Sequence, residues 1–417
     1  MEVGSKIKYY RVNKKMTQEE LASGIISVSY LSKIENNQVD TGMDIIALLC
    51  EKLEISPELP VDSDVPNLCM DFFRNLLNRS IDDSKELFTN LEPDIESINH
   101  FGYLRLFEIQ KIKYFMLTGD LPAAEAQIEA LKRKRYHFTR VEEYYWHKFN
   151  GNYRYLNSDF TNAYDSYKKA QKLFNFDIYY YEEEESDLNY SISLTTSKLW
   201  NTYLSINYAQ KALEYYQRKY NVKRCIECHL LLGINYGRNK EYKNAISSYK
   251  VAKKLATTIK SQSLLSSCEQ NLGHLYSLQD KSDAAIEHFK SSYKNKEADD
   301  KTILNPIFSL VKEYHRTSRN EEAKNWLNKG FKVIKHLNIH NSPRTLDFQV
   351  YDYLINNYSQ EFEKFMIQTV IPFYEQKKSK MELSKSLKLL AQYYFDDRKY
   401  KNSSIYFAKA YSILESI

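Results

Sequence analysis

The chain is poor in residues that break helices. Its 417 residues include only 10 glycines and 8 prolines, which argues against a fold with many tight turns. The frequent Leu, Ala, Lys, Glu, Gln and Ser residues favour helices instead. The composition therefore predicts a nearly all-α protein, and the length predicts either two domains or a repeat array.

Other absences limit where the protein can work. No run of about 18 apolar residues is present that could cross a membrane, and the first residues lack the pattern of a cleavable export signal. Five cysteines without a regular spacing fit reduced thiols and no disulfides. We therefore expect a cytoplasmic protein with no membrane partner.

Catalytic motifs are missing as well. The sequence has no phosphate-binding Gly loop, no HExxH helix and no nucleophile elbow. "CIECH" at residues 225–229 matches a haem-attachment pattern, but it lies inside the best-formed repeat and supplies too few ligands for structural zinc. We expect no enzymatic activity, no cofactor and no metal.

The N-terminal 60 residues carry closely spaced signals for helix starts. Thr17 and Glu20 predict a capping box at the start of a second helix. Ser27 is the predicted N-cap of a third helix that ends near Glu35, with Leu31 facing inward. Short and polar residues remain on its outer face, as a helix entering a DNA major groove requires.

This third helix predicts DNA contacts. Lys33 can bond to a guanine edge, Ser29 can donate or accept, and Gln18 is placed to meet a phosphate. Charge alone would not suggest DNA, because residues 1–60 contain seven Lys/Arg and nine Asp/Glu. One such unit reads few base pairs, so we expect a dimer or higher oligomer on DNA. A structural three-helix bundle that never meets DNA is the alternative.

A repeat follows a predicted linker. Residues 56–66, "SPELPVDSDVP", hold three of the eight prolines and no helical periodicity. Farther on, "LLGINYGRNKEYKNAISSYKVAKKL" (231–255) and "NLGHLYSLQDKSDAAIEHFKSSYK" (271–294) match at six positions, and weaker copies recur every 38 to 41 residues. The order of apolar, small and aromatic residues resembles the tetratricopeptide repeat. We expect eight or nine stacked helix pairs over residues 67–417, forming a right-handed superhelix with a concave inner surface.

Residues 1–60 resemble an Xre/Cro-type helix-turn-helix domain. Joined to such repeats, the chain is similar to the peptide-sensing regulators of Gram-positive bacteria, the Rap, NprR, PlcR and PrgX group. Its length, repeat count and "TQEELASGIISVSYLSKIENN" are most similar to NprR. The resemblance implies a quorum-sensing transcriptional regulator that a short re-imported signalling peptide controls. It also leaves an alternative, a protein that sequesters or inhibits a phosphorelay protein. The DNA contacts that it implies fall on Gln18, Val28, Ser29, Tyr30 and Lys33.

The same resemblance places the peptide in the concave groove, on first-helix positions of the repeats. Amide side chains both donate and accept, which suits the backbone of an extended peptide. Basic side chains could meet peptide carboxylates. We expect a homodimer or homotetramer whose candidate peptide-binding residues are Asn152, Arg154, Tyr155, Asn189, Asn235, Gln270, Asn271, His274, Asn305, Lys312, Arg316 and Gln392.

Overall fold

A computed structural model describes most of the chain. Its described part forms two compact units, Met1–Leu188 (the N-terminal unit) and Asn189–Ile417 (the C-terminal unit). Every element in that part is helical, which confirms the predicted all-α class. None of these helices is long and apolar enough to span a bilayer. The described residues are 3–14, 16–36, 38–39, 41–53, 55, 65–133, 135, 138–296, 300–339, 342–356, 360–377 and 379–415, so positions 56–64 of the predicted linker lie outside them.

Four short helices form the N-terminal head. Their buried residues include Ile7, Leu21, Leu31, Ile34 and Leu49, which pack into one core. The helices that supply them are α1 (Val3–Asn13), α2 (Gln18–Ala22), α3 (Val28–Glu35) and α4 (Met43–Lys52).

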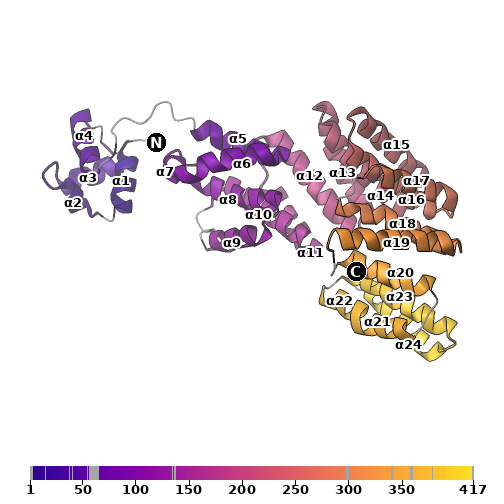
Figure 1. Ribbon diagram of the computed structural model, residues 1–417. Coiled ribbons are helices and arrows are strands. Elements are labelled where there is room, and N and C mark those ends of the chain that lie inside the picture. The colour runs from indigo at the N-terminus through magenta and orange to yellow at the C-terminus, as the bar shows by residue number, and fades with distance from the viewer. Residues whose placement is uncertain are drawn as a thin grey trace. The chain divides into compact units, whose positions relative to one another are not determined.

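Antiparallel helix pairs make up the rest of both units (Figure 1). The N-terminal unit continues with α5 (Val65–Asn78), α6 (Ile81–Leu91), η1 (Glu92–Asp94), α7 (Ile95–His100), α8 (Leu104–Thr118), α9 (Leu121–Lys132), α10 (Arg140–Leu156), α11 (Phe160–Leu173) and the first part of α12 (Tyr181–Lys198). The C-terminal unit contains α13 (Thr202–Arg218), α14 (Val222–Arg238), α15 (Tyr242–Thr258), α16 (Gln262–Ser277), α17 (Ser282–Lys294), η3 (Lys301–Ile303), α18 (Leu304–Arg316), α19 (Asn320–His336), α20 (Pro343–Ile355), α21 (Gln360–Phe365), the π-helical η4 (Met366–Val370), α22 (Ile371–Gln376), α23 (Lys380–Asp396) and α24 (Tyr400–Glu415).

Glycine lets paired helices approach each other at the matched repeat positions. A Cβ atom on Gly233 would lie 2.3 Å from Cε1 of Tyr249, and one on Gly273 would lie 2.5 Å from Cε1 of Phe289. Real Cβ atoms do not come so close, so the aromatic ring of the second helix occupies the space that a side chain would need. This contact explains why the repeat pattern couples a small residue to an aromatic residue.

Many interhelical turns contain a left-handed residue that is not glycine. At Lys240 (φ 63°), the N–H donates to the Gly237 carbonyl at 3.1 Å, and the Glu241 N–H donates to the Tyr236 carbonyl at 2.9 Å. These two bonds form a Schellman motif, which satisfies the last carbonyls of the helix. Gly119 (φ 85°) forms the same turn after α8, but most of these turns contain no glycine that would mark them in the sequence. Left-handed residues recur at Ser158, Tyr180, Trp200, Tyr220, Lys240, Lys260, Asp280, Ser318, Asn338 and Arg398.

Candidate functional sites

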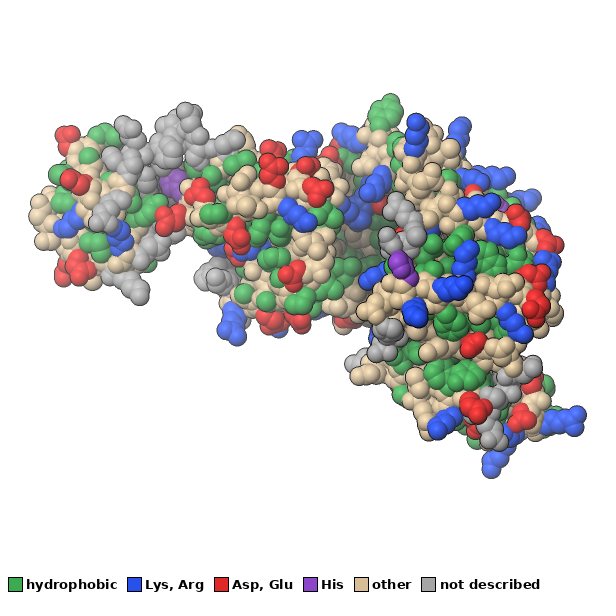
Figure 2. Space-filling model, viewed as in Figure 1, with side chains coloured by type: hydrophobic (Ala, Val, Ile, Leu, Met, Phe, Trp, Pro, Cys, Tyr) green, Lys and Arg blue, Asp and Glu red, His purple; other side chains and the backbone are tan. Residues whose placement is uncertain are grey.

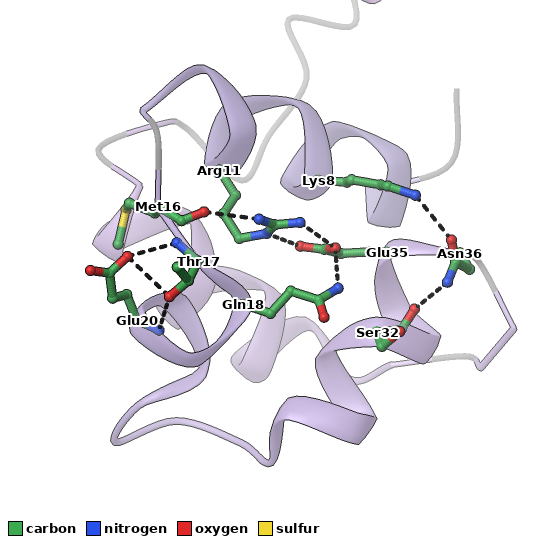
Figure 3. Close-up of polar contacts among 9 residues, drawn as sticks. All are labelled: Lys8, Arg11, Met16, Thr17, Gln18, Glu20, Ser32, Glu35 and Asn36. Atoms are coloured by element: carbon green, nitrogen blue, oxygen red, sulfur yellow. Dashed lines mark hydrogen bonds and ion pairs between the residues drawn. The ribbon is translucent and has the colours of Figure 1, made fainter.

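Side-chain caps fix the start of the two central helices of the head. Thr17 Oγ1 accepts from the Glu20 N–H at 3.1 Å, and the Thr17 N–H donates to Glu20 Oε2 at 2.6 Å (Figure 3). Ser27 Oγ accepts from the Tyr30 N–H at 3.2 Å. Both predicted helix starts are therefore confirmed, and they place α3 after a short turn.

Helix α3 has one buried face and one open face. Leu31 and Ile34 are buried in the head core, whereas Ser29 and Lys33 are exposed. Val28 is 39% exposed. The half-buried Tyr30 packs against the core. The open face thus presents short and hydrogen-bonding groups, the kind that read base edges in a major groove.

A buried carboxylate ties α3 to α1 and α2. Arg11 donates through Nε to Glu35 Oε1 at 2.6 Å and through Nη2 to Oε2 at 2.9 Å. Gln18 Nε2 also donates to Glu35 Oε2, at 2.8 Å (Figure 3). Burial alone would raise the pKa of Glu35, but the bonds from Arg11 and Gln18 outweigh it and lower that pKa. The amide of Gln18, which we expected to meet a phosphate, is thus engaged inside the head, where it fixes the position of α3.

The C-terminal unit contains a groove of about 840 Å³ that crosses α16, α18, α20 and α23. Five of the predicted peptide-binding residues line it: Gln270, Asn271, His274, Asn305 and Lys312. The remaining lining residues are Phe308, Ser309, Ser342, Pro343, Arg344, Leu346, Asp347, Val350, Tyr351, Met366, Val370, Tyr374, Glu382, Lys385, Ser386 and Leu389. We call this the α16–α23 groove.

Polar side chains on the groove wall are already connected to one another. Gln270 Nε2 donates to Ser309 Oγ at 2.7 Å. Arg344 donates through Nη2 to Asn305 Oδ1 and through Nη1 to Asp347 Oδ2, both at 2.9 Å. These bonds join three successive first helices and hold their side chains in place. The chain itself therefore holds these polar groups of the groove wall in fixed positions.

Burial in the groove shifts the pKa values of its titratable groups. His274 is exposed on the groove wall, but desolvation by the surrounding walls lowers its pKa to about 4, and the cations Lys312 and Arg344 act in the same direction. Burial also raises the pKa of Asp347 to about 6, against the opposing effect of Arg344. At neutral pH His274 is therefore neutral and Asp347 mostly ionised.

Two predicted groove residues are placed differently. Asn235 is fully buried, and its Nδ2 donates to Ser205 Oγ at 3.0 Å and to the Leu231 carbonyl at 2.7 Å. Its amide thus stabilises the interior of the repeat instead of lining a groove wall. Arg316 lies outside the α16–α23 groove, where it pairs with Glu313 at 2.6 Å and with Asp280 at 2.7 Å.

The other five predicted residues also lie outside the α16–α23 groove. Asn189 is buried in α12. The others have partners within their own units. Asn152 Oδ1 accepts from the Tyr167 hydroxyl at 2.7 Å, Arg154 donates to the Asn162 carbonyl at 3.2 Å, the Tyr155 ring contacts Phe160 at 5.3 Å between centroids, and Gln392 donates to Asp396 at 2.8 Å.

Comparisons with known proteins agree with the head and with the overall class. Residues 7–59 match a helix-turn-helix family. Over 408 residues the chain is 33% identical to the transcriptional activator NprA of Geobacillus stearothermophilus, covering 95% of this chain and 99% of that protein. The chain belongs to the NprA family of transcriptional activators. A second relative of this NprA-family protein is response regulator aspartate phosphatase A of Bacillus subtilis, 27% identical over 52% of this chain and 57% of that protein.

Solved structures share the fold of this NprA-family protein. The apo form of the quorum sensor NprR from B. thuringiensis has a TM-score of 0.69 at 18% identity, covering 85% of this chain and 99% of the other. NprR in complex with its cognate peptide NprX has a TM-score of 0.65 at 17% identity, covering 86% and 100%. Together with the helix-turn-helix match over residues 7–59, these likenesses support the predicted succession of a helix-turn-helix head and helical repeats.

Several groove residues were absent from the sequence prediction. Arg344 and Asp347 lie on α20, and Lys385 lies on α23, both of which belong to weaker copies of the repeat. The opposite charges of Arg344 and Asp347, three residues apart on one helix, were a usable signal. The buried pair of Arg11 and Glu35 was missed because the partners are far apart in the sequence.

Proposed function

We propose that this NprA-family regulator reads an operator through α3 and is controlled by a short extended peptide bound in the α16–α23 groove. The observation that carries the proposal is the presence, in one chain, of an exposed capped helix and a preorganised polar groove in a separate unit. A peptide that binds one conformation of the repeats better than another would shift the activity of the DNA-binding heads. The peptide would have to enter the cytoplasm.

The open face of α3 supports the DNA part of this proposal. Val28, Ser29 and Lys33 are exposed on it, and Glu35 fixes its position from the buried side. We assign base contacts to Ser29 and Lys33 and an apolar contact to Val28. One α3 helix covers few base pairs, so two heads in a homodimer or homotetramer would bind paired half-sites.

The groove supports the peptide part. Its volume of about 840 Å³ falls within the usual range of ligand sites, roughly 300–1,000 Å³. Amides, hydroxyls and an imidazole line one side, and Val350, Met366, Val370 and Leu389 add apolar contacts. Such a mixture suits an extended peptide, whose backbone needs hydrogen bonds and whose side chains need apolar contacts. The similar fold of NprR, solved with the peptide NprX, agrees with this use.

Band shifts with operator DNA test the first part. We expect Lys33→Ala and Ser29→Ala each to cost about 1–3 kcal/mol of binding free energy and to relax base preference. Lys132→Ala removes the same charge from an exposed position on α9 and should leave binding unchanged. Affinity should fall steeply with salt, since phosphate contacts release counterions. Equal affinities of all three variants and wild type would refute DNA reading by α3.

Sequestration of a phosphorelay protein is a second candidate, because a response regulator aspartate phosphatase is among the relatives. In either case we infer that the chain acts by binding. The two functions separate in the cell. If the regulated phenotype survives Lys33→Ala and Ser29→Ala while DNA binding is lost, sequestration is the operative activity.

A further inference from the structure

We infer that the ligand of the α16–α23 groove carries a carboxylate that pairs with Lys312. This inference rests on the proposed peptide-binding function and narrows it to peptides that present a carboxylate at one position in the groove. A side-chain carboxylate and the C-terminal carboxylate have the same chemistry, and the experiment below separates them.

The groove contains more cations than its own carboxylates neutralise. Arg344 pairs with Asp347 at 2.9 Å, and Lys385 pairs with Glu382 at 2.8 Å. In the part of the chain that the structure describes, no carboxylate forms an ion pair with Lys312. With His274 neutral, the lining thus has one excess positive charge, and that charge belongs to Lys312.

The surroundings of Lys312 disfavour a lone ammonium. Its Nζ lies 6.0 Å from the centre of the Phe308 ring, a weak electrostatic partner compared with a carboxylate. The Lys312 side chain is exposed to the groove, but partial desolvation by the groove walls, together with Lys385 and Arg344, outweighs the nearby carboxylates and lowers its pKa. A ligand carboxylate would offset both the lost hydration and the repulsion, and a charge-assisted hydrogen bond is roughly twice as strong as a neutral one.

The charge of the whole C-terminal unit favours the same class of ligand. Residues 189–417 contain 36 Lys/Arg and 22 Asp/Glu, whereas residues 1–188 contain 23 and 32. Figure 2 shows Lys and Arg side chains gathered over α13 to α17 on the viewed face. A positive unit raises the local concentration of anionic ligands and speeds their association. An acidic peptide is therefore attracted before it reaches the groove.

Peptide selection by the full-length protein tests the inference. The probe is a random heptapeptide library, prepared once with free C-termini and once amidated, and passed over immobilised protein. Wild type should enrich Asp or Glu over Asn or Gln at one position, on the order of tenfold, or prefer free C-termini over amides by a similar factor. The amidated arm thereby shows which carboxylate Lys312 meets.

Two substitutions of equal charge complete the design. Lys312→Glu should abolish the acidic preference and favour Lys or Arg, whereas Lys332→Glu, at an exposed position on α19, should select like wild type. Lys312→Gln should lose the preference without reversing it, and circular dichroism verifies that each variant is folded. An unchanged selection by Lys312→Glu overturns the inference alone, and so does a wild type that prefers neither acidic residues nor free C-termini. Retention of no peptide by wild type overturns the proposed peptide function as well.

Discussion

The two units each contain a lysine among carboxylates, and the two clusters differ in what completes them. In the N-terminal unit, Lys148 is paired with Glu184 and, at 2.9 Å, with Asp187, and its side chain is 1% exposed. The Tyr144 hydroxyl donates to Glu184 at 2.9 Å and closes the cluster. In the C-terminal unit, Lys312 faces an open groove and has no such pairing with any carboxylate that the structure describes. In the first cluster the lysine and both carboxylates are paired within the chain, so the cluster stabilises the fold. In the second cluster the lysine has no carboxylate partner among the described residues, so we expect a ligand to supply one.

The pKa shifts of the two lysines support this contrast. Burial opposes the charge on Lys148, but Asp187 and Glu184 outweigh it and raise its pKa. For Lys312, burial and neighbouring cations outweigh the nearby carboxylates and lower its pKa. The charged form of lysine is therefore stabilised at position 148 in the N-terminal unit and destabilised at position 312 in the C-terminal unit.

The largest effect is expected from removing the paired lysine. Lys148→Met leaves two buried carboxylates without their cation and should cost about 3–5 kcal/mol of unfolding free energy. Hydrogen exchange of the amides in α10 and α12 measures this loss locally, without assuming that both units unfold together. Lys312→Met is the matched variant, and exchange in α18 should change by less than about 1 kcal/mol. Equal losses of stability in Lys148→Met and Lys312→Met would show that the two lysines do not differ in their contribution to the fold.

A smaller loss of unfolding free energy is expected from removing the Tyr144 hydroxyl from the Lys148 cluster. Tyr144→Phe removes one hydrogen bond to the buried Glu184 and should cost about 1–3 kcal/mol. Urea unfolding followed by exchange in α10 measures the loss. Tyr203→Phe removes a hydroxyl from a side chain that is 77% exposed and should be neutral. A neutral Tyr144→Phe would show that Glu184 does not need this donor.

The smallest effect is expected from titrating the open groove, because its two shifted groups act in opposite directions. Asp347 binds its proton more tightly in the folded chain, with a pKa of about 6 against 3.8, so its contribution to stability falls as the pH rises from about 4 to about 6. His274 binds its proton less tightly when folded, with a pKa of about 4 against 6.5, so its contribution rises over a similar interval.

Single substitutions separate these two contributions. In Asp347→Asn the unfolding free energy should rise with pH between about 4 and 6.5, and in His274→Gln it should fall between about 4 and 6. Wild type should be flatter than both, which urea titrations at several pH values can measure. If both variants keep the wild-type slope, the groove does not perturb these groups.

Features set by neighbouring residues could be predicted from the sequence. The capping box of Thr17 and Glu20 and the cap at Ser27 act within one helical turn, so their residue types sufficed. The contact of Gly233 with Tyr249 was predictable because the same pair recurs at Gly273 and Phe289. The helix starts and the repeat packing could therefore be predicted from neighbouring residues and from the recurrence of the pattern.

Contacts between distant residues could not be predicted in the same way. Gln18 meets Glu35 across 17 positions, a contact that its position at the start of a helix did not reveal. Asn235 sits on a first helix like the groove residues, but its depth depends on the packing of Ser205 from the previous repeat. Arg344 and Lys385 lie in weaker copies of the repeat, so the repeat pattern did not indicate that they line the groove.

The most direct test is a crystal structure of the full-length protein with a heptapeptide that wild type retains and Lys312→Glu does not. The account predicts an extended peptide in the α16–α23 groove, with a carboxylate within hydrogen-bonding distance of Lys312 Nζ and the Arg344–Asp347 pair intact. A peptide bound in the N-terminal unit, or one that leaves Lys312 without an anion, would contradict it.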